Sequence, residues 1–541
     1  MLSVRRAARR RGLPAAIVAL ACVLAGCSMN RPQASHGTSV PSTGDPAAAA
    51  AALVARLADE DLVGQVLMPA INLDDSAAGS AELVRRHHLG GVIIMPPAHA
   101  VDDQAALAQK LTSELQAAGA SLPAGVRLLI ATDQEYGFVT RIRSGMVQLP
   151  SAMAFGAAAR PELTETAWHG AANELAAIGI NVDFAPDADV IGSAGNTVIG
   201  SRSYGSDPAA VSEQVSAVVR GLQAAGVAAS VKHFPGHGHT SVNSHETLPV
   251  LPQNRQSLNA ADLAPFRAGI DAGAMLVMAG HLDVRAIDPG VSATFSRKVL
   301  VDLLRGELGF TGVTVSDAMN MAPAMRWPPG EAAVRAVLAG IDLVLMPPDV
   351  QAARQGLLDA VRGGLLPRER LVEAATRVLA LKFRLGAFPA ARVSTADKET
   401  NAMVAAEAAA LAVTVLRGPC TGPLVSGAVR VTASGGREQQ RGWLADALRS
   451  RDIEVVERGG AVVHLVGYGD VAADLATGAA VTVAMDSPYI LQSATSAVRV
   501  ATYSSTQAAM QALAAVIAGQ ASAPGRSPVA VAGLPRSACS S

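Results

Sequence analysis

Residues 227 to 245 read Val227-Ala228-Ala229-Ser230-Val231-Lys232-His233-Phe234-Pro235-Gly236-His237-Gly238-His239-Thr240-Ser241-Val242-Asn243-Ser244-His245. The first five residues are small or apolar, which is typical of a strand buried in a parallel sheet. The remaining residues include one lysine, four histidines and two glycines, and they are predicted to form a loop. A strand followed by a reactive loop is where an α/β barrel carries its catalytic groups.

Seven further apolar runs resemble the strand at Ala228–Val231. They are Gln65–Pro69, Gly91–Met95, Arg127–Thr132, Ile180–Phe184, Met275–Ala279, Gly312–Val315 and Asp342–Met346. Amphipathic stretches, among them Glu162–Leu175, Asp207–Ala225 and Lys298–Leu308, lie between them. Eight strand–helix repeats predict an α/β fold of the TIM (β/α)8 type, closed by a helix at Val372–Phe388. A doubly wound open sheet is the alternative.

A second, smaller α/β sandwich domain is expected after the barrel. A helix from about Thr400 leads into short apolar runs, which are Leu411–Leu416, Val429–Ala433, Ala461–Val466, Ala480–Ala484 and Val498–Tyr503, with helices at Glu438–Ser450 and Gln507–Ala518. The expected domain boundaries are 51–389 for the barrel, 390–404 for a connector and 405–541 for the second domain. Few His, Asp or Glu residues cluster there, so we expect it to support rather than catalyse.

The composition of the chain argues against two kinds of binding site. The 541 residues carry a formal net charge of −1, which argues against nucleic acid as a partner because nucleic acid requires a strong basic field. Aromatic residues make up 3%, so long aromatic platforms for stacking sugars are not expected.

The amino terminus reads as a targeting segment. Five arginines precede a short apolar run, Leu13–Leu24, which is too short to span a bilayer. The run ends in Leu24-Ala25-Gly26-Cys27, which resembles a bacterial lipobox. The resemblance implies a signal peptide over 1–27, lipidation of Cys27, a flexible tether over 28–50 and export to the outer face of the bacterial cell membrane. An ordinary signal peptide with a chance cysteine is the alternative.

Two cysteines, Cys420 and Cys539, remain outside the targeting segment. In an exported protein they could form a disulfide bond, and a pair of free thiols is the alternative.

Polar residues follow most of the predicted strands and should therefore meet at one rim of the barrel. Asp317 follows Gly312–Val315, where its carboxylate could attack the anomeric carbon of a sugar. A helix N-cap is the alternative role for Asp317. His245 is the candidate proton donor and acceptor, since a neutral imidazole near pH 7 suits both tasks.

Further polar residues suit recognition of hydroxyl and amide groups. They are Asp133, Arg141, Arg202, Lys232 and His233. A carboxylate accepts hydrogen bonds from hydroxyls, whereas Arg and Lys donate to sugar oxygens. An ion-pair network that only stabilises the barrel is the alternative.

Residues 53 to 385 resemble glycoside hydrolase family 3, in its bacterial β-N-acetylhexosaminidase branch. The motifs that carry the resemblance are Asp133-Gln134-Glu135-x-Gly137-x-Val139-x-Arg141, Gly179-Ile180-Asn181-Val182-Asp183-Phe184-Ala185-Pro186, Val198-Ile199-Gly200-Ser201-Arg202-Ser203-Tyr204-Gly205, Lys232-His233-Phe234-Pro235-Gly236-His237-Gly238 with Ser244-His245, and Ser316-Asp317-Ala318-Met319.

The resemblance implies a retaining exo-β-N-acetylglucosaminidase that acts on cell-wall muropeptide fragments without a metal or other cofactor. Asp317 matches the nucleophile and His245 the histidine acid/base. The residues named above for hydroxyl and amide recognition match the positions that bind the terminal N-acetylglucosamine.

Two positions depart from the family pattern. Asn243 stands where the family usually has an Asp that forms a dyad with the catalytic histidine. Asn can still accept a hydrogen bond from His245, but it offers no charge, and Glu246 is a candidate substitute. Tyr136 replaces a glycine, and its ring could reshape the sugar pocket.

Three other activities stay open. One is phosphorolysis, since a neutral histidine repels phosphate less than a carboxylate does. Another is sugar binding without catalysis by a lipoprotein, which Asn243 suggests. The third is a metallohydrolase that uses His237, His239 and His245, because imidazoles are common zinc ligands.

Overall fold

The structure is a computed structural model that describes residues 45–192, 194–388 and 391–539. The predicted signal peptide, Cys27 and residues 28–44 of the predicted tether lie outside the described residues. The described residues belong to one compact unit. Within them, no helix combines the length and the apolar character needed to cross a membrane.

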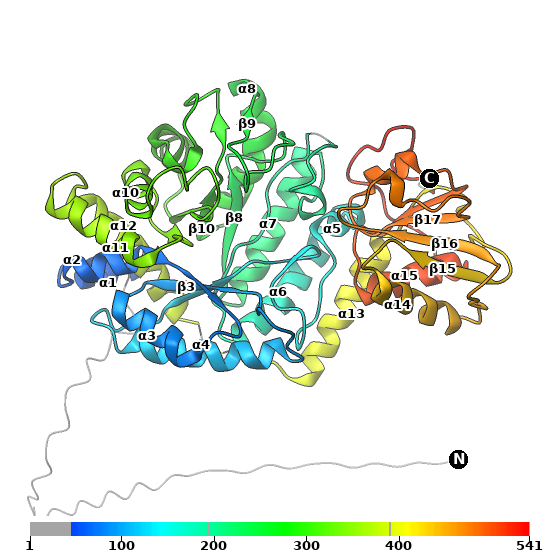
Figure 1. Cartoon of the computed structure of the whole chain (residues 1–541), viewed down its shortest axis with the longest axis horizontal. Helices are drawn as coiled ribbons and strands as arrows, with labels where there is room; N and C mark the ends of the chain where they lie inside the picture. Colours follow the sequence, from blue (N-terminus) through cyan, green and yellow to red (C-terminus); the bar gives the residue numbers. More distant parts are fainter. Residues whose placement is uncertain (1–44, 193, 389–390, 540–541) are drawn as a thin grey trace, which may run out of the picture. The chain divides into compact units, whose positions relative to one another are not determined.

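Parallel strands form the first part of the fold (Figure 1). In spatial order, seven hydrogen-bonded strands are β12 (Val313–Ser316), β10 (Leu276–Ala279), β8 (Ala228–Phe234), β7 (Val182–Asp183), β4 (Leu129–Thr132), β3 (Gly91–Met95) and β2 (Ala70–Asn72). β13 (Val344–Leu345) pairs with β1 (Leu67–Met68), and a bridge between Val315 and Leu343 joins it to β12. Pro69, which lies between β1 and β2, accepts the N–H of Ile93 in β3 at 3.0 Å. The strands therefore close into a TIM-like barrel, which confirms the predicted fold class over an open sheet.

Helices cover the outside of the strands, as in a TIM barrel. They are α1 (Pro46–Val54), α2 (Asp59–Gln65), α3 (Ala77–His87), α4 (Gln104–Ala120), α6 (Pro161–Ala177), α7 (Pro208–Ala224), α9 (Leu263–Asp271), the π-helix η4 (Lys298–Glu307), α10 (Pro329–Ala339), α11 (Val350–Arg362) and α12 (Arg368–Gly386). α7 illustrates the local causes. Asp207 caps it by accepting hydrogen bonds from two backbone N–H groups, and Pro208 supplies the first helical residue, where no N–H is needed.

The strand predicted at Ala228–Val231 is longer in the structure. β8 extends to Phe234, because its pairing with β10 continues to the register Phe234–Ala279. Lys232 and His233 were predicted to lie in the following loop, but they lie on this buried strand. A strand fixes the direction of each side chain more tightly than a loop does.

The second sheet is mixed. Its strand order is β14 (Thr414–Arg417), β18 (Val498–Ala501), β17 (Val481–Ala484), β16 (Ala461–Val466) and β15 (Val429–Ala433), and only β14 is antiparallel to its neighbour. Helices α14 (Glu438–Arg449) and α15 (Gln507–Ile517) accompany it, as Figure 1 shows. The preceding helix α13 (Thr395–Ala412) begins five residues earlier than predicted, because Ser394 and Asp397 form a capping box there.

Contacts between the barrel and the second sheet are extensive. A cluster of buried apolar residues joins the two, including Met153 and Ile199 from the barrel side and Leu416 and Tyr503 from the other. The Ser151 hydroxyl also donates a hydrogen bond of 2.6 Å to the carbonyl oxygen of Tyr503. Residues far apart in the sequence are thereby fixed in position where the two parts meet.

Cys420 and Cys539 form a disulfide bond, which decides between the two alternatives for these thiols. The bond joins the segment after β14 to the end of the described chain.

Candidate active site

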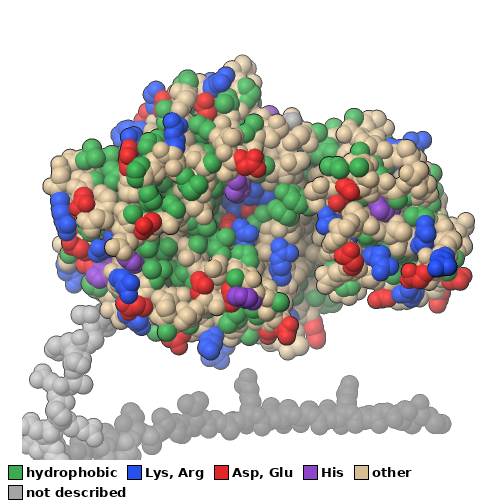
Figure 2. All heavy atoms as spheres, in the orientation of Figure 1, with side chains coloured by type: hydrophobic (Ala, Val, Ile, Leu, Met, Phe, Trp, Pro, Cys, Tyr) green, Lys and Arg blue, Asp and Glu red, His purple; other side chains and the backbone are tan. Residues whose placement is uncertain are grey.

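A cavity of about 420 Å³ opens where the barrel strands end. Its lining contains all eight residues to which the sequence assigned a catalytic or sugar-binding role, namely Asp133, Arg141, Arg202, Lys232, His233, Asn243, His245 and Asp317. Figure 2 shows histidine, basic and acidic side chains together on the visible face of the barrel. The structure therefore brings the predicted set to one place.

Asp133 lies directly after β4, at the floor of this cavity. Its carboxylate accepts hydrogen bonds from Lys232 Nζ at 2.9 Å and from Arg141 Nη2 at 3.2 Å. Burial opposes ionisation of Asp133, but the two cations outweigh it and hold its pKa below the ordinary value of 3.8. Asp133 is thus a charged acceptor that points at the cavity.

Glu135 was quoted within a motif but received no role from the sequence. Its two carboxylate oxygens accept hydrogen bonds from Arg202 Nε at 2.7 Å and Nη2 at 2.9 Å, and Lys232 Nζ lies 2.6 Å from Oε1. Burial opposes ionisation of Glu135, but Arg202 and Lys232 keep its pKa far below normal. In the sequence, only its position two residues after Asp133 indicated that Glu135 could belong to the site. A paired guanidinium of this kind is held rigidly.

His233 joins these charges to a buried carboxylate. Its Nδ1 lies 2.8 Å from Asp189 Oδ2, and its Nε2 lies 3.2 Å from Arg202 Nη2. Because a guanidinium only donates, Nε2 accepts and Nδ1 carries the proton. Burial and the neighbouring Arg202 lower the pKa of His233, so this ring is neutral. We name Asp133, Glu135, Arg141, Lys232, Arg202, His233 and Asp189 the Asp133 network.

The alternative prediction, that these residues form an ion-pair network that only stabilises the barrel, is right about the ion pairs but wrong about their only role. They do form one, but every member except Asp189 also lines the cavity. The same contacts that stabilise the barrel end therefore hold donors and acceptors in place for a ligand.

Asp317 follows β12 and is 9% exposed. Its Oδ1 accepts the N–H of Ala318 at 2.8 Å, but turns follow and the next helix, α10, begins only at Pro329. The N-cap alternative is therefore wrong. Burial opposes ionisation, yet the positive charge that His281 and His233 carry when they are protonated, together with the hydrogen bond from the Ala318 N–H, holds the pKa of Asp317 below its ordinary value of 3.8. Asp317 is ionised at neutral pH, as a carboxylate nucleophile must be.

His245 lies on the loop that follows β8, beside the same cavity. Asn243 Oδ1 lies 3.0 Å from both the backbone N and the Nδ1 of His245, while Asn243 Nδ2 donates to Glu246 Oε1 at 2.9 Å. An ionised carboxylate can only accept, so Glu246 fixes the Asn243 amide with its oxygen toward His245. His245 then carries its proton on Nδ1, and Nε2 is left to exchange a proton with a ligand. Glu246 thus acts on Asn243 and makes no hydrogen bond to His245.

Desolvation by the surrounding protein lowers the pKa of His245 below 6.5. The carboxylate of Asp317 acts in the opposite direction, and Arg202 adds to the lowering. The imidazole is therefore mostly neutral near pH 7.

The two other histidines of the loop do not form a metal site with His245. His239 Nδ1 lies 2.7 Å from Asp262 Oδ1, away from the cavity lining. The His237 ring is buried and neither of its nitrogens has a hydrogen-bond partner, and burial lowers its pKa to about 3. Across the described ranges, the one group with metal-ligand spacing is Asp187, Asp189 and His233. The three-histidine metal hypothesis is therefore not supported by the geometry.

The Tyr136 ring does not reshape the sugar pocket. It packs edge-on against Trp168 in the core, with ring centroids 5.5 Å apart, and it is absent from the cavity lining. Its φ of 63° explains why a glycine also suits this position. Phe138 and Asn320, which follow predicted strands but had no assigned role, also line the cavity, and so does Tyr468. For Tyr468, which comes from the second domain, the sequence held no signal.

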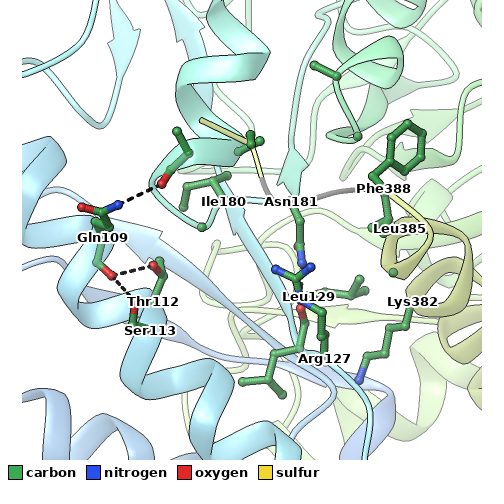
Figure 3. Close-up of a pocket in the computed structure, with 18 residues that line it drawn as sticks. Gln109, Thr112, Ser113, Arg127, Leu129, Ile180, Asn181, Lys382, Leu385 and Phe388 are labelled. Atoms are coloured by element: carbon green, nitrogen blue, oxygen red, sulfur yellow. Dashed lines mark hydrogen bonds between the residues drawn. The ribbon is translucent and has the colours of Figure 1, made fainter. Parts of the chain in front are cut away.

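A separate cavity of about 270 Å³ lies at the opposite ends of the strands (Figure 3). Residues that precede β4 and β7, such as Arg127 and Asn181, line it together with Lys382 of α12. Burial lowers the pKa of Lys382 to about 7, and its Nζ donates to Gln65 Oε1 at 2.6 Å. The described lining has no carboxylate, so it lacks the groups needed for glycoside chemistry.

Comparison with known proteins agrees with this geometry. Residues 59–381 match the family profile described as "Glycosyl hydrolase family 3 N terminal domain". Beta-hexosaminidase A from Pseudoalteromonas piscicida is 35% identical over 373 residues, which cover 64% of this chain and 62% of that protein. Beta-hexosaminidase LpqI from Mycobacterium tuberculosis (strain ATCC 25618 / H37Rv) is 32% identical over 390 residues, covering 68% of this chain and 96% of the relative. The chain thus spans less than two thirds of the Pseudoalteromonas protein.

A solved structure resembles both parts of the fold. A glycoside hydrolase family 3 beta-N-acetylglucosaminidase from Paenibacillus sp. str. FPU-7 superposes with a TM-score of 0.80 at 34% identity, covering 88% of this chain and 99% of that chain. The matched profile, the relatives and the shared two-part fold lead to one conclusion: this chain belongs to glycosyl hydrolase family 3, in its β-N-acetylhexosaminidase branch.

Proposed function

We propose that this protein is a retaining exo-β-N-acetylglucosaminidase. The single observation that carries the proposal is the lining of one cavity by an ionised Asp317, an oriented His245 and the buried donors and acceptors of the Asp133 network. A terminal sugar bound by this network at the floor would present its glycosidic bond to Asp317 and His245. Similarity to β-hexosaminidases of 32 to 35% identity supports N-acetylhexosamine as the sugar class.

The geometry supports a double displacement. An Asp317 oxygen attacks C1 of the terminal sugar, and the C1–O bond to the leaving group breaks while protonated His245 gives its Nε2 proton to the departing oxygen. A glycosyl ester on Asp317 results. Neutral His245 then takes a proton from water, whose oxygen attacks C1 and releases Asp317. Asn243 keeps the imidazole oriented in both steps.

Muropeptide fragments of the cell wall are the proposed natural substrates, and the outer face of the cell membrane is the proposed location. The arginine-rich start, the short apolar run and the Leu24-Ala25-Gly26-Cys27 sequence support a lipid anchor on Cys27. The Cys420–Cys539 disulfide bond is in keeping with an oxidising compartment. Detergent-phase partition of the protein from cells, lost in Cys27→Ser, is the expected result. Equal partition of both forms would refute the anchor.

The test of the activity is the initial rate of 4-nitrophenol release from 4-nitrophenyl β-N-acetylglucosaminide by the full chain in detergent. We expect turnover in phosphate-free buffer, and a loss of at least about 10³-fold in kcat for Asp317→Ala with unchanged thermal unfolding. A rate like that of the unmodified protein would refute Asp317 as nucleophile.

The same assay separates the remaining alternatives. Turnover that requires phosphate and yields a sugar phosphate would assign phosphorolysis. Binding of N-acetylglucosamine without release of 4-nitrophenol, from this or a disaccharide substrate, would instead assign a sugar-binding protein.

A further inference from the structure

Two aromatic rings from different domains stack at the mouth of the cavity. The centroids of Phe138 and Tyr468 lie 3.6 Å apart with an interplanar angle of 21°, and both rings line the cavity. Phe138 lies in the turn between β5 (Gln134–Tyr136) and β6 (Val139–Thr140), just after the Asp133 position. Tyr468 follows the carboxyl end of β16 in the second sheet.

Both rings are exposed although the chain is poor in aromatic residues. The sequence has three Trp, five Tyr and nine Phe, and most of the described ones are buried or half-buried. Among the described residues, the exposed large hydrophobic side chains include two aromatic ones, Phe138 at 47% and Tyr468 at 40% exposure. Water contact with apolar ring surface is unfavourable, so exposed rings that gather at a cavity mark a binding surface.

The backbone on both sides of the pair is held in place. Arg437 donates a hydrogen bond to the carbonyl oxygen of Tyr468, and Asp470 accepts from the N–H of Gly467 at 2.6 Å. On the barrel side, a Cβ at Gly137 would approach the Ser151 Cβ to 2.7 Å, so the turn before Phe138 packs closely. A surface fixed before binding loses little conformational entropy when a ligand arrives.

We infer that the Phe138–Tyr468 pair binds the first sugar ring of the leaving group, a role that rests on the proposed glycosidase function. The terminal sugar has its partners at the buried floor, where the Lys232 side chain is 3% exposed. The leaving group must therefore point toward the mouth, where the aromatic pair lies. One face of a pyranose presents C–H groups, which pack on the outer face of an aromatic ring. The preferred substrates are accordingly disaccharides or longer chains.

The test compares two substrates of the full chain. N,N′-diacetylchitobiose has a pyranose leaving group, whereas methyl β-N-acetylglucosaminide has none. For Tyr468→Ala we expect kcat/KM on the disaccharide to fall by about 3- to 10-fold, chiefly through KM, with no change on the methyl glycoside. Tyr468→Phe should retain the activity, because the ring face and not the hydroxyl makes the contact. Val471→Ala is the matched control, since Val471 is exposed in the same loop but absent from the cavity lining.

A double-mutant cycle adds a second readout. Because the rings stack on each other, Phe138→Ala combined with Tyr468→Ala should cost less than the sum of the two single losses. Equal losses on both substrates, or no loss on the disaccharide, would overturn the assignment.

Failure of the glycosidase proposal itself gives a different result. The unmodified protein would then cleave neither substrate, and calorimetry on the Asp317→Asn protein would decide the role of the pair. Tighter binding of diacetylchitobiose than of N-acetylglucosamine, with the difference removed by Tyr468→Ala, would support the sugar surface. Equal affinities would overturn it.

Discussion

Two buried ionic networks in the barrel both pair arginines with carboxylates but face different surroundings. In the first, the Asp133 network described above, Lys232 and Arg202 pair with carboxylates that line the cavity. In the second, the fully buried Asp342 accepts from Arg305 Nη2 at 2.5 Å, Arg370 Nη2 at 2.8 Å and Arg377 Nη1 at 3.1 Å. None of these four residues lines the 420 Å³ cavity.

The positions of the two networks along the strands explain the difference. Asp133 follows β4, at the carboxyl end where the cavity opens, whereas Asp342 precedes β13 and accepts the N–H of Thr314 in β12. The Asp342 network therefore joins η4 and α12 to the strands at the other end. Buried charge alone therefore does not identify a functional site in a barrel; the charged groups must also line a cavity that a ligand can enter.

Asp342→Ala should give the largest effect on stability. The change removes the buried carboxylate that three guanidinium groups share, although Arg370 and Arg377 also pair with Glu373. Breaking a buried ion pair by removing one partner typically costs about 3 to 5 kcal/mol. Urea unfolding measures the loss, and kcat of the folded protein at low temperature should stay unchanged. A loss of kcat without a loss of stability would contradict the division between the two networks.

Asp133→Ala should lower activity as well as stability, because Asp133 both lines the cavity and pairs with Lys232 and Arg141. It removes an acceptor for the terminal sugar, so kcat/KM for 4-nitrophenyl β-N-acetylglucosaminide should fall by about 10- to 100-fold. Asp133→Asn, which keeps the shape, separates charge from packing. Unfolding with unchanged kcat/KM would instead place Asp133 with Asp342 as a purely stabilising group.

Glu246→Ala tests the orientation of His245. Without the carboxylate the Asn243 amide can rotate and present Nδ2 to the imidazole, so kcat should fall by about 3- to 10-fold, the effect of one lost hydrogen bond. Glu246→Gln still offers an acceptor and should restore most of the rate. The same loss in both variants would indicate that the charge of Glu246, rather than its hydrogen bond, matters.

The plot of kcat/KM against pH should be bell-shaped, with both limbs at lower pH than the ordinary pKa values of Asp and His would give. The nucleophile Asp317 acts when deprotonated, so activity rises with pH through its pKa, which lies below 3.8. His245 acts first as an acid, so activity falls as pH rises through its pKa, which lies below 6.5. Asn243→Asp adds a negative charge beside the imidazole, raises its pKa and should move only the alkaline limb upward. An unmoved alkaline limb would assign that limb to another group.

Much of the fold was predictable because buried parallel strands are apolar on both faces. Val429–Ala433 and Ala461–Val466 have the same bounds in the prediction and in β15 and β16. The errors in the predicted strand bounds lie mostly at strand ends. Gln65, predicted in a strand, ends helix α2, and β8 runs on through the polar Lys232 and His233 because neighbouring strands supply the pairing. The hydrophobic periodicity of a single segment contains no information about which strands will pair with it.

The candidate site shows the same division. Residues that follow strands, such as Asp133 and Asp317, were predicted to meet because the carboxyl ends of barrel strands share one rim. Glu135 as the partner of Arg202 was not predictable, since an ion pair across 67 residues leaves no local pattern. The sequence alone did not decide between a disulfide bond and free thiols at Cys420 and Cys539, because only the fold places these two residues side by side.

By itself, the sequence determined where most of the strands lie along the chain and which reactive side chains follow them. Local hydrophobic pattern and strand direction suffice for these features. Only the tertiary structure decided that Glu246 orients Asn243, that His239 turns to Asp262, and that Tyr468 of the second domain reaches the cavity mouth. These features depend on side-chain directions and long-range packing, which the spacing of residues along the chain does not encode.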